Sequence, residues 1–79
     1  MSDWVFVERA KRRETQATVA AAVGKSRSWL ASLERAEFQP RVEDCALLAR
    51  YFGESLAEVL GIAGYTTVEI DAILESAAR

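Results

Sequence analysis

The chain has 79 residues and 51% of them are apolar, which suffices for one small hydrophobic core but not for a second. It has one cysteine and no histidine, so we expect no disulfide framework, no metal site, no cofactor and no enzymatic pairing of a nucleophile with a base. We find no apolar run of about 18 residues and no signal segment, so we expect no membrane span.

The formal net charge of −2 is unevenly distributed along the chain. Residues 1–41 carry eight Lys or Arg and five acids, whereas residues 42–79 carry two Arg and seven acids. One side of the molecule can therefore meet phosphates while the other side repels them. The acidic half is either a solvated surface or a surface for a basic partner.

Sparse glycine and proline, and the lack of an alternating β-branched run, predict an all-α fold. The first helix is expected over residues 3–13, with its buried side led either by Trp4 and Val7 or by Val5 and Phe6. The basic run 11–13 ends this helix. Its cations either complement the helix dipole or contact the phosphate backbone of a nucleic acid.

Residues 15–35 show two short apolar periodicities separated by the turn Gly24-Lys25-Ser26. Gly24 is suited to a left-handed residue after a helix, and the hydroxyl groups of Thr15 and Ser26 can cap the two helices. Two short helices joined by a glycine turn are typical of a helix-turn-helix motif, whose second helix enters a DNA groove. An ordinary helical hairpin in a small bundle would show the same pattern.

The helix expected over residues 26–35 has a polar face without any acid. This face carries two guanidinium groups, two hydroxyl groups and one small residue, on Arg27, Ser28, Ala31, Ser32 and Arg35. Arginine can bond guanine in the major groove, serine can pair with several bases, and alanine can touch a thymine methyl group. We therefore expect Arg27, Ser28 and Ser32 to read base edges. Trp29, on the flank, either packs to orient the helix or touches DNA.

Residues 36–41 are expected to form a loop, because Pro40 stops the helix. Phe38, in this loop, is expected to plug the core. The next helix is expected over residues 42–52 and ends at Gly53. Cys45 lies on its apolar stripe and is interpreted as a small core residue; an unpaired cysteine is typical of a reducing cytoplasm. Leu47 and Tyr51 form a second stripe, which either packs on the neighbouring helix or forms a dimer seam.

Capping-box patterns begin two more helices, expected over residues 55–61 and 67–78, and Gly61 and Gly64 are expected to break the chain between them. The last helix is too short to be stable alone, so it needs a surface to pack on. Either its own domain or a partner chain supplies that surface, and we favour a twofold partner. Its apolar face has helical spacing and consists of Ile70, Ile73, Leu74 and Ala77.

Residues 4–62 resemble the Cro/lambda-repressor-like, xenobiotic-response-element (XRE) type of helix-turn-helix domain. The matching positions are Thr15, Gln16, Val19, Ala20, Val23, Gly24, Ser26, Leu30, Leu33, Glu34, Arg35 and Pro40, followed by the run from Val42 to Leu60. The chain departs from the family pattern at Glu14, usually apolar, at Lys25, usually small and aliphatic, and at Ala36, usually glycine. A left-handed Ala36 would cost about 1 kcal/mol.

The resemblance implies a compact five-helix domain, here residues 1–64, to which residues 65–79 add a sixth helix for packing or dimerisation. Such domains are usually bacterial or phage transcription regulators that bind operators as dimers, so a cytoplasmic location is expected. The residues expected to hold DNA phosphates are Thr15, Gln16, Lys25, Arg35 and Arg41. For Arg41 this role is what the resemblance implies, and for Gln16 the resemblance supports it.

The sequence thus predicts a non-enzymatic, sequence-specific regulator of transcription, a repressor that binds a palindromic operator on double-stranded DNA as a homodimer. One alternative is the antitoxin of a toxin–antitoxin pair, with the last helix contacting the toxin. Another is a helical adaptor that keeps the fold but binds protein through Leu47, Tyr51 and the last helix. The acid-free face of residues 27–35 argues against the adaptor.

Overall fold

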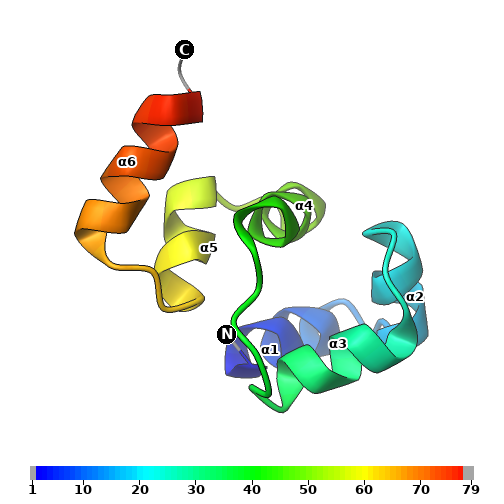
Figure 1. The fold of residues 1–79 in the computed structure, drawn as a ribbon. Coiled ribbons are helices and arrows are strands. Elements are labelled where there is room, and N and C mark those ends of the chain that lie inside the picture. The colour runs from blue at the N-terminus through cyan, green and yellow to red at the C-terminus, as the bar shows by residue number, and fades with distance from the viewer. Residues whose placement is uncertain (1, 78–79) are drawn as a thin grey trace.

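The computed structural model describes residues 2–77, and this part of the chain folds into α-helices joined by short connections (Figure 1). The all-α fold that the sequence predicts is therefore confirmed. In chain order the helices are α1 (Ser2–Lys11), α2 (Gln16–Ala22), α3 (Arg27–Glu34), α4 (Val42–Phe52), α5 (Leu56–Ile62) and α6 (Thr67–Ala77). The expected last residue of α6, residue 78, lies outside the described residues.

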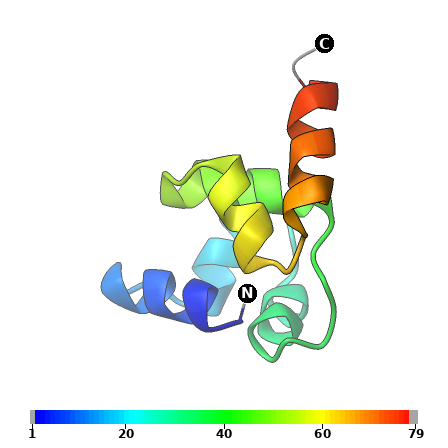
Figure 2. The ribbon, with the colours of Figure 1, turned by 90° about the vertical axis from the view of Figure 1, so that its left-hand side faces the viewer.

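The helices form two packed groups with α6 at one end (Figures 1 and 2). Helix α3 contacts α1 and α2, α4 contacts α5, and α6 packs on α5. In both views α3 lies on one side of the molecule and α6 on the opposite side. The helix-turn-helix pair and the C-terminal helix therefore present separate surfaces.

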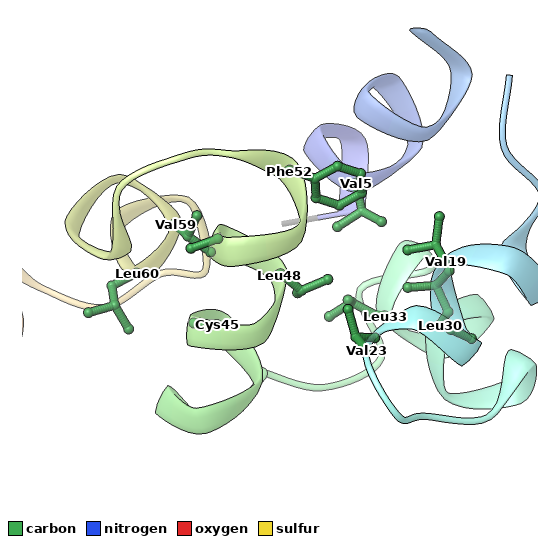
Figure 3. Close-up of a cluster of buried hydrophobic side chains, with 12 residues drawn as sticks. Val5, Val19, Val23, Leu30, Leu33, Cys45, Leu48, Phe52, Val59 and Leu60 are labelled. Atoms are coloured by element: carbon green, nitrogen blue, oxygen red, sulfur yellow. The ribbon is translucent and has the colours of Figure 1, made fainter. Parts of the chain in front are cut away.

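One hydrophobic core joins the two groups, with side chains from α1 to α5 (Figure 3). Cys45 is part of it and fully buried, as the sequence predicts, and burial raises the pKa of its thiol to about 11. The core consists of Val5, Val19, Ala20, Val23, Leu30, Leu33, Cys45, Leu48, Ala49, Phe52, Val59 and Leu60. Val23, Leu30 and Leu33 anchor the helix-turn-helix pair in this core.

The inner side of α1 differs from both pairings that the sequence suggested. Val5 is fully buried and Trp4 packs beside it, edge-on to the ring of Phe52 at 5.2 Å between centroids, while Phe6 and Val7 are exposed. The helix is also short and irregularly amphipathic, so periodicity alone did not identify its inner side. It ends at Lys11 rather than residue 13, because Arg13 is left-handed with a φ of 54°.

Four of the described helices end in the same Schellman motif. After α2, the N–H of Gly24 donates to the carbonyl of Ala21 and the N–H of Lys25 donates to the carbonyl of Ala20, at 3.2 and 2.8 Å. Equivalent bond pairs end α1, α3 and α5. The left-handed residues at their centres are Arg13, Gly24, Ala36 and Gly64. The prediction that Gly61 also breaks the chain is wrong, because Gly61 lies within α5.

In the loop between α3 and α4, the buried side chain is Pro40 rather than Phe38. Pro40 is fully buried, whereas Phe38 is 36% exposed and lies outside the core, so the prediction for Phe38 is wrong. The Tyr65 hydroxyl donates to the carbonyl of Pro40 at 2.8 Å, and the Gln39 amide donates to the carbonyl of Ala63 at 3.2 Å. These two bonds bind the loop to the α5–α6 connection, which fixes the position of α6.

Helix α6 folds back on its own domain along part of its apolar face. Ile70 and Ile73 pack against the core, Leu74 is half-buried, and Ala77 is exposed. The helix begins with the predicted capping box, in which Thr66 and Glu69 exchange backbone-to-side-chain bonds of 2.8 and 3.2 Å. No helix in the described part of the chain has the length and hydropathy needed to span a membrane.

Candidate nucleic-acid interface

The helix-turn-helix pair is held by local bonds at each end of its helices. The Thr15 hydroxyl accepts from the N–H of Thr18 at 3.1 Å, and the Ser26 hydroxyl accepts from the N–H of Trp29 at 3.0 Å. Gly24 between the helices is left-handed, with a φ of 72°. Each of these three residues has the local role that the sequence predicts. The caps satisfy free amides at the start of each helix, so the turn is rigid.

Helix α3 has a buried face and an outward face. Leu30 and Leu33 are fully buried and fix the rotation of the helix about its axis. Trp29, on the flank, packs against the core and lies 5.7 Å from the ring of Phe38, which agrees with its packing interpretation. The outward face can therefore meet a groove without rearrangement of the helix.

The polar side chains of this outward face differ in how far they are engaged. The side chains of Arg27 and Ser28 are exposed and make no hydrogen bond or ion pair with another residue of the range 2–77. Ala31 and Ser32 are half-buried. Arg27, in the first turn of α3, is therefore the guanidinium group of this face that is free to fork onto a base.

Arg35, at the other end of this face, is held by an acid. Its Nε and Nη2 atoms donate to the Glu37 carboxylate at 2.7 and 3.2 Å, and Nη2 also lies 3.4 Å from Ser32 Oγ. The hydrogen bond from Arg35 lowers the pKa of Glu37, and the same bond raises the pKa of Arg35. The sequence predicts a phosphate contact for Arg35 but does not reveal the pairing with Glu37, which follows the helix and is not part of its polar face.

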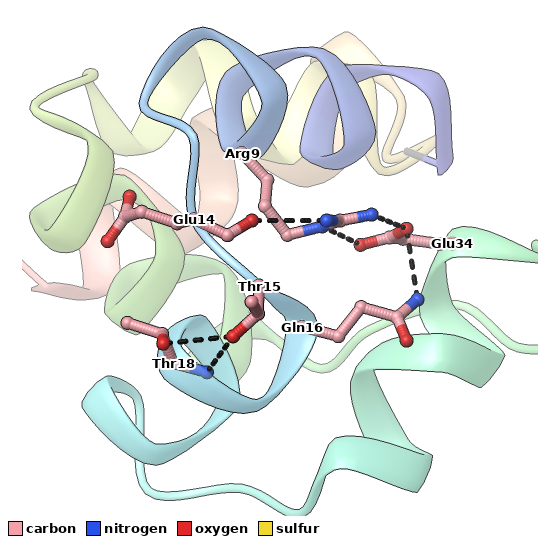
Figure 4. A network of polar contacts seen from close by, with 6 residues as sticks. All are labelled: Arg9, Glu14, Thr15, Gln16, Thr18 and Glu34. Atoms are coloured by element: carbon pink, nitrogen blue, oxygen red, sulfur yellow. Dashed lines mark hydrogen bonds and ion pairs between the residues drawn. The ribbon is translucent and has the colours of Figure 1, made fainter.

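Thr15 is the N-cap of α2 and Gln16 is its first residue (Figure 4). The Gln16 amide donates to Glu34 Oε1 at 3.2 Å, and the Thr15 hydroxyl also shares a 2.9 Å bond with Thr18. Arg9 forks onto the same Glu34 carboxylate with two bonds of 3.0 Å. Figure 4 shows this chain of contacts linking α1, α2 and α3. It fixes the start of α2 relative to α3, and sequence reasoning missed it because 25 residues separate Arg9 from Glu34.

Lys25 is directed toward the protein. Its ammonium group lies 2.8 Å from Asp44 Oδ1 and 5.3 Å from the centre of the Trp29 ring. The Asp44 side chain is only 6% exposed, so this ion pair joins the turn to the start of α4. The sequence predicts that Lys25 reaches a phosphate, whereas the structure pairs it with an acid. The sequence around Lys25 does not reveal this pair, because the carboxylate belongs to α4 and reaches the turn only through tertiary packing.

Arg41 lies at the N-cap of α4 with an exposed side chain. The side chain is 84% exposed, and its guanidinium group is only loosely paired with Glu43, at 4.0 Å. Its backbone N–H donates to the buried Asp44 carboxylate at 3.3 Å, which holds the loop in place. The side chain therefore remains available to a phosphate.

The arginine-rich end of α1 is used largely within the protein. Arg12 donates to Glu8 Oε2 at 2.7 Å and to the carbonyl of Phe52 at 3.0 Å, and it lies over the Phe52 ring. Glu14, the departure from the apolar family pattern, accepts a hydrogen bond from the Tyr51 hydroxyl. Arg12 thus joins α1 to the end of α4, and its bond to the carbonyl of Glu8 at 3.1 Å fits a cation that complements the dipole of its own helix.

The residues suggested for a dimer seam do not form one exposed surface. Leu47 is 42% exposed, whereas Tyr51 is half-buried with its hydroxyl bonded to Glu14 and its ring edge-on to Phe52. Tyr51 therefore contributes to packing within the domain, and Leu47 is the accessible member of that stripe. Within residues 2–77 there is also no pocket and no metal-ligating cluster of side chains.

Comparison with known proteins gives the family. A family model described as helix-turn-helix matches residues 9–59, well over half of the chain and all of α2, α3 and α4. No curated protein and no solved structure matches the chain. Proteins of this family are DNA-binding regulators of transcription, and the capped helix pair with its acid-free outward face is the matching structural element. The chain therefore belongs to the helix-turn-helix family of the XRE type, the Cro/lambda-repressor-like DNA-binding domains.

Proposed function

We propose that this protein is a sequence-specific repressor of transcription that binds an inverted-repeat operator as a homodimer. The observation that carries the proposal is the outward face of α3. Its first turn presents the unpaired guanidinium group of Arg27 beside the exposed Ser28, while Leu30 and Leu33 lock the opposite face into the core. A helix held in this way is suited to the major groove of double-stranded DNA.

In this proposal Arg27, Ser28 and Ser32 read base edges, and the groups around them set the position of the protein on the backbone. Thr15 and Gln16 at the start of α2 offer backbone amides and an amide side chain to one phosphate. Arg41 offers an exposed cation to another. Lys25 and Arg35 are left out of the proposed phosphate contacts because each is paired with a carboxylate, that of Asp44 and that of Glu37.

The dimer is proposed from α6. None of its described side chains is fully buried, although Ile70, Ile73, Leu74 and Ala77 share a face. A twofold partner would cover what α5 leaves exposed, and a twofold dimer is the assembly that matches an inverted repeat with half-sites about 34 Å apart. In a bacterial cell, the bound dimer would repress transcription by occluding the operator.

The test is selection of the full chain against a pool of randomised DNA duplexes, followed by sequencing. We expect enrichment of an inverted repeat with half-sites about one helical turn apart. The Arg27→Ala variant in the same pool should lose preference at one position of each half-site. A reporter gene with the selected operator in its promoter should then be less active when the protein is present.

Failure to enrich any sequence, with the protein folded by circular dichroism, would refute sequence-specific recognition by this chain alone. The expected partner would then be a protein bound through α6, which is a toxin if the chain is an antitoxin. Enrichment of a single half-site with no repeat would refute the dimer but keep the base-reading role of α3.

A further inference from the structure

Glu37 is an acid fixed beside the proposed DNA-reading face of α3. The left-handed Ala36 reverses the chain directly after the helix, with a φ of 56°. The N–H of Glu37 then donates to the carbonyl of Ser32 at 3.1 Å, one of the two bonds of the Schellman motif. Glu37 is therefore held next to the last turn of α3 by its backbone as well as by its side chain.

The Glu37 carboxylate binds the guanidinium group of Arg35 with two bonds, of 2.7 and 3.2 Å. Paired bonds of this kind hold an arginine in one plane, and here the plane is directed toward Ser32, 3.4 Å away. Both side chains are accessible, with 59% of Arg35 and 49% of Glu37 exposed. The pair is thus a surface feature that approaching DNA would meet.

The two ends of α3 consequently differ in what they offer a phosphate. Arg27, at the N-terminal end, is an unpaired cation beside the positive end of the helix dipole. At the C-terminal end, Arg35 and Glu37 cancel in charge, and the helix carbonyls add partial negative charge. A phosphate at that end must compete with a carboxylate already bound to Arg35.

We propose that Glu37 is a specificity-determining residue that limits non-specific DNA binding by occupying Arg35. With Glu37 present, Arg35 adds little to binding on an arbitrary duplex, and affinity depends on base contacts near the N-terminal end of α3. Without the carboxylate, Arg35 can neutralise one phosphate on any sequence. This inference rests on the proposed DNA-binding function.

The experiment measures the affinity of the full chain for a duplex of arbitrary sequence by fluorescence anisotropy over a series of salt concentrations. We expect Glu37→Gln to bind this duplex about fivefold to tenfold more tightly than the wild type at about 0.1 M salt, with a salt slope steeper by about 0.9. Specificity for a selected operator, as the ratio of the two affinities, should fall.

Two further variants separate the pair from net charge alone. Asp71→Asn makes the same change in net charge on α6, on the opposite side of the molecule from α3, and should leave the slope unchanged (Figures 1 and 2). Adding Arg35→Gln to Glu37→Gln should abolish most of the gain. Circular dichroism checks that each variant is folded.

An unchanged slope in Glu37→Gln, an equal gain in Asp71→Asn, or a gain that persists without Arg35 would overturn this inference while wild-type binding to DNA remained. If neither the wild type nor Glu37→Gln bound any duplex at low salt, the proposed DNA-binding function would fail together with it. The two failures are therefore distinguished by the wild-type titration.

Discussion

Arg27 and Arg35 stand at the two ends of α3 and have different surroundings. Arg27 is exposed and unpaired within the described range, whereas Arg35 is bonded to Glu37. The sequence shows two equivalent arginines on one helical face, and only the turn after α3 distinguishes them. In the proposed function, Arg27 is therefore the residue whose substitution bears most directly on base recognition.

Arg27→Ala should weaken binding to the selected operator by about 1–3 kcal/mol and relax specificity at one base position, because a forked contact with a base edge is lost. Titration of the operator and its single-base variants measures this. Arg41→Ala is the matched comparison, since it should weaken all sequences alike and reduce the salt slope by about one. A uniform loss in Arg27→Ala would show that Arg27 contacts only phosphate.

At the scale of helices and their ends, Schellman motifs shape the fold. Two of the four contain a residue other than glycine at the left-handed position, Arg13 after α1 and Ala36 after α3. Left-handed backbone brings the Cβ atom close to a carbonyl oxygen, at a cost of roughly 1–2 kcal/mol. These two turns therefore store strain that glycine would relieve.

Ala36→Gly should raise the free energy of unfolding by about 0.5–1 kcal/mol, since relief of the strain exceeds the larger entropy that glycine loses on folding. Urea denaturation followed by circular dichroism measures the change. The control is Ala21→Gly in the right-handed backbone of α2, which should lower stability by roughly 1 kcal/mol. If both variants shifted the urea midpoint in the same direction, strain at Ala36 would not be the reason.

The contact between α1 and α4 should make stability depend on pH. A hydrogen bond from Arg12 is the main cause that lowers the pKa of Glu8 from its ordinary value of 4.5. Because the pKa is lower in the folded state, the stabilisation is complete above about pH 4.5 and is lost as the pH falls through the folded value. Arg12 also bonds the carbonyl of Phe52, so protonation of Glu8 loosens this contact.

Glu8→Gln should lower the free energy of unfolding at pH 7 by about 0.5–1 kcal/mol and reduce its fall below pH 4.5. Urea denaturation at a series of pH values between about 3 and 7 tests this, since that interval spans the titration of carboxylates. Asp71→Asn, which removes a carboxylate from α6, serves as the comparison. Parallel pH profiles for wild type and Glu8→Gln would contradict the role of this contact.

At the scale of the whole molecule, the two proposed interfaces lie on opposite sides (Figures 1 and 2). Helix α3 and the start of α2 are on one side, and α6 is on the other, attached through α5 and the bonds to the α3–α4 loop. Neither interface obstructs the other. A second copy of the chain can therefore be joined through α6 while both copies keep α3 exposed.

Leu74→Lys should weaken the proposed dimer at least tenfold, about 1.4 kcal/mol, because it places a charge on the apolar face of α6. Leu74 is only half-buried in the single chain, so the monomer should remain folded. Sedimentation equilibrium over a range of concentrations measures the effect. Ala72→Lys, on the exposed opposite face of the same helix, should leave association unchanged; equal effects of the two variants would refute this interface.

The features that could be predicted from sequence are those decided within a few residues. Thr15 and Ser26 cap their helices, Gly24 is left-handed, and Cys45 lies on the buried stripe of α4, because hydroxyl caps, positive φ and helical periodicity depend on neighbours in the chain. The weakly periodic α1 marks the limit of this reasoning. Its length and inner side were set by Arg13 and by the packing of Trp4 and Val5.

The sequence by itself determined the helical class, the capped helix pair and the acid-free face of α3, since each follows from local backbone preference and apolar spacing. Only the tertiary structure decided which charged groups are free to meet DNA. Lys25 is paired with Asp44. Glu34 binds both Gln16, which lies 18 residues before it in the chain, and Arg9, which lies 25 residues before it. Such pairs form because packing brings distant carboxylates within bonding distance, and no local pattern in the chain records that distance.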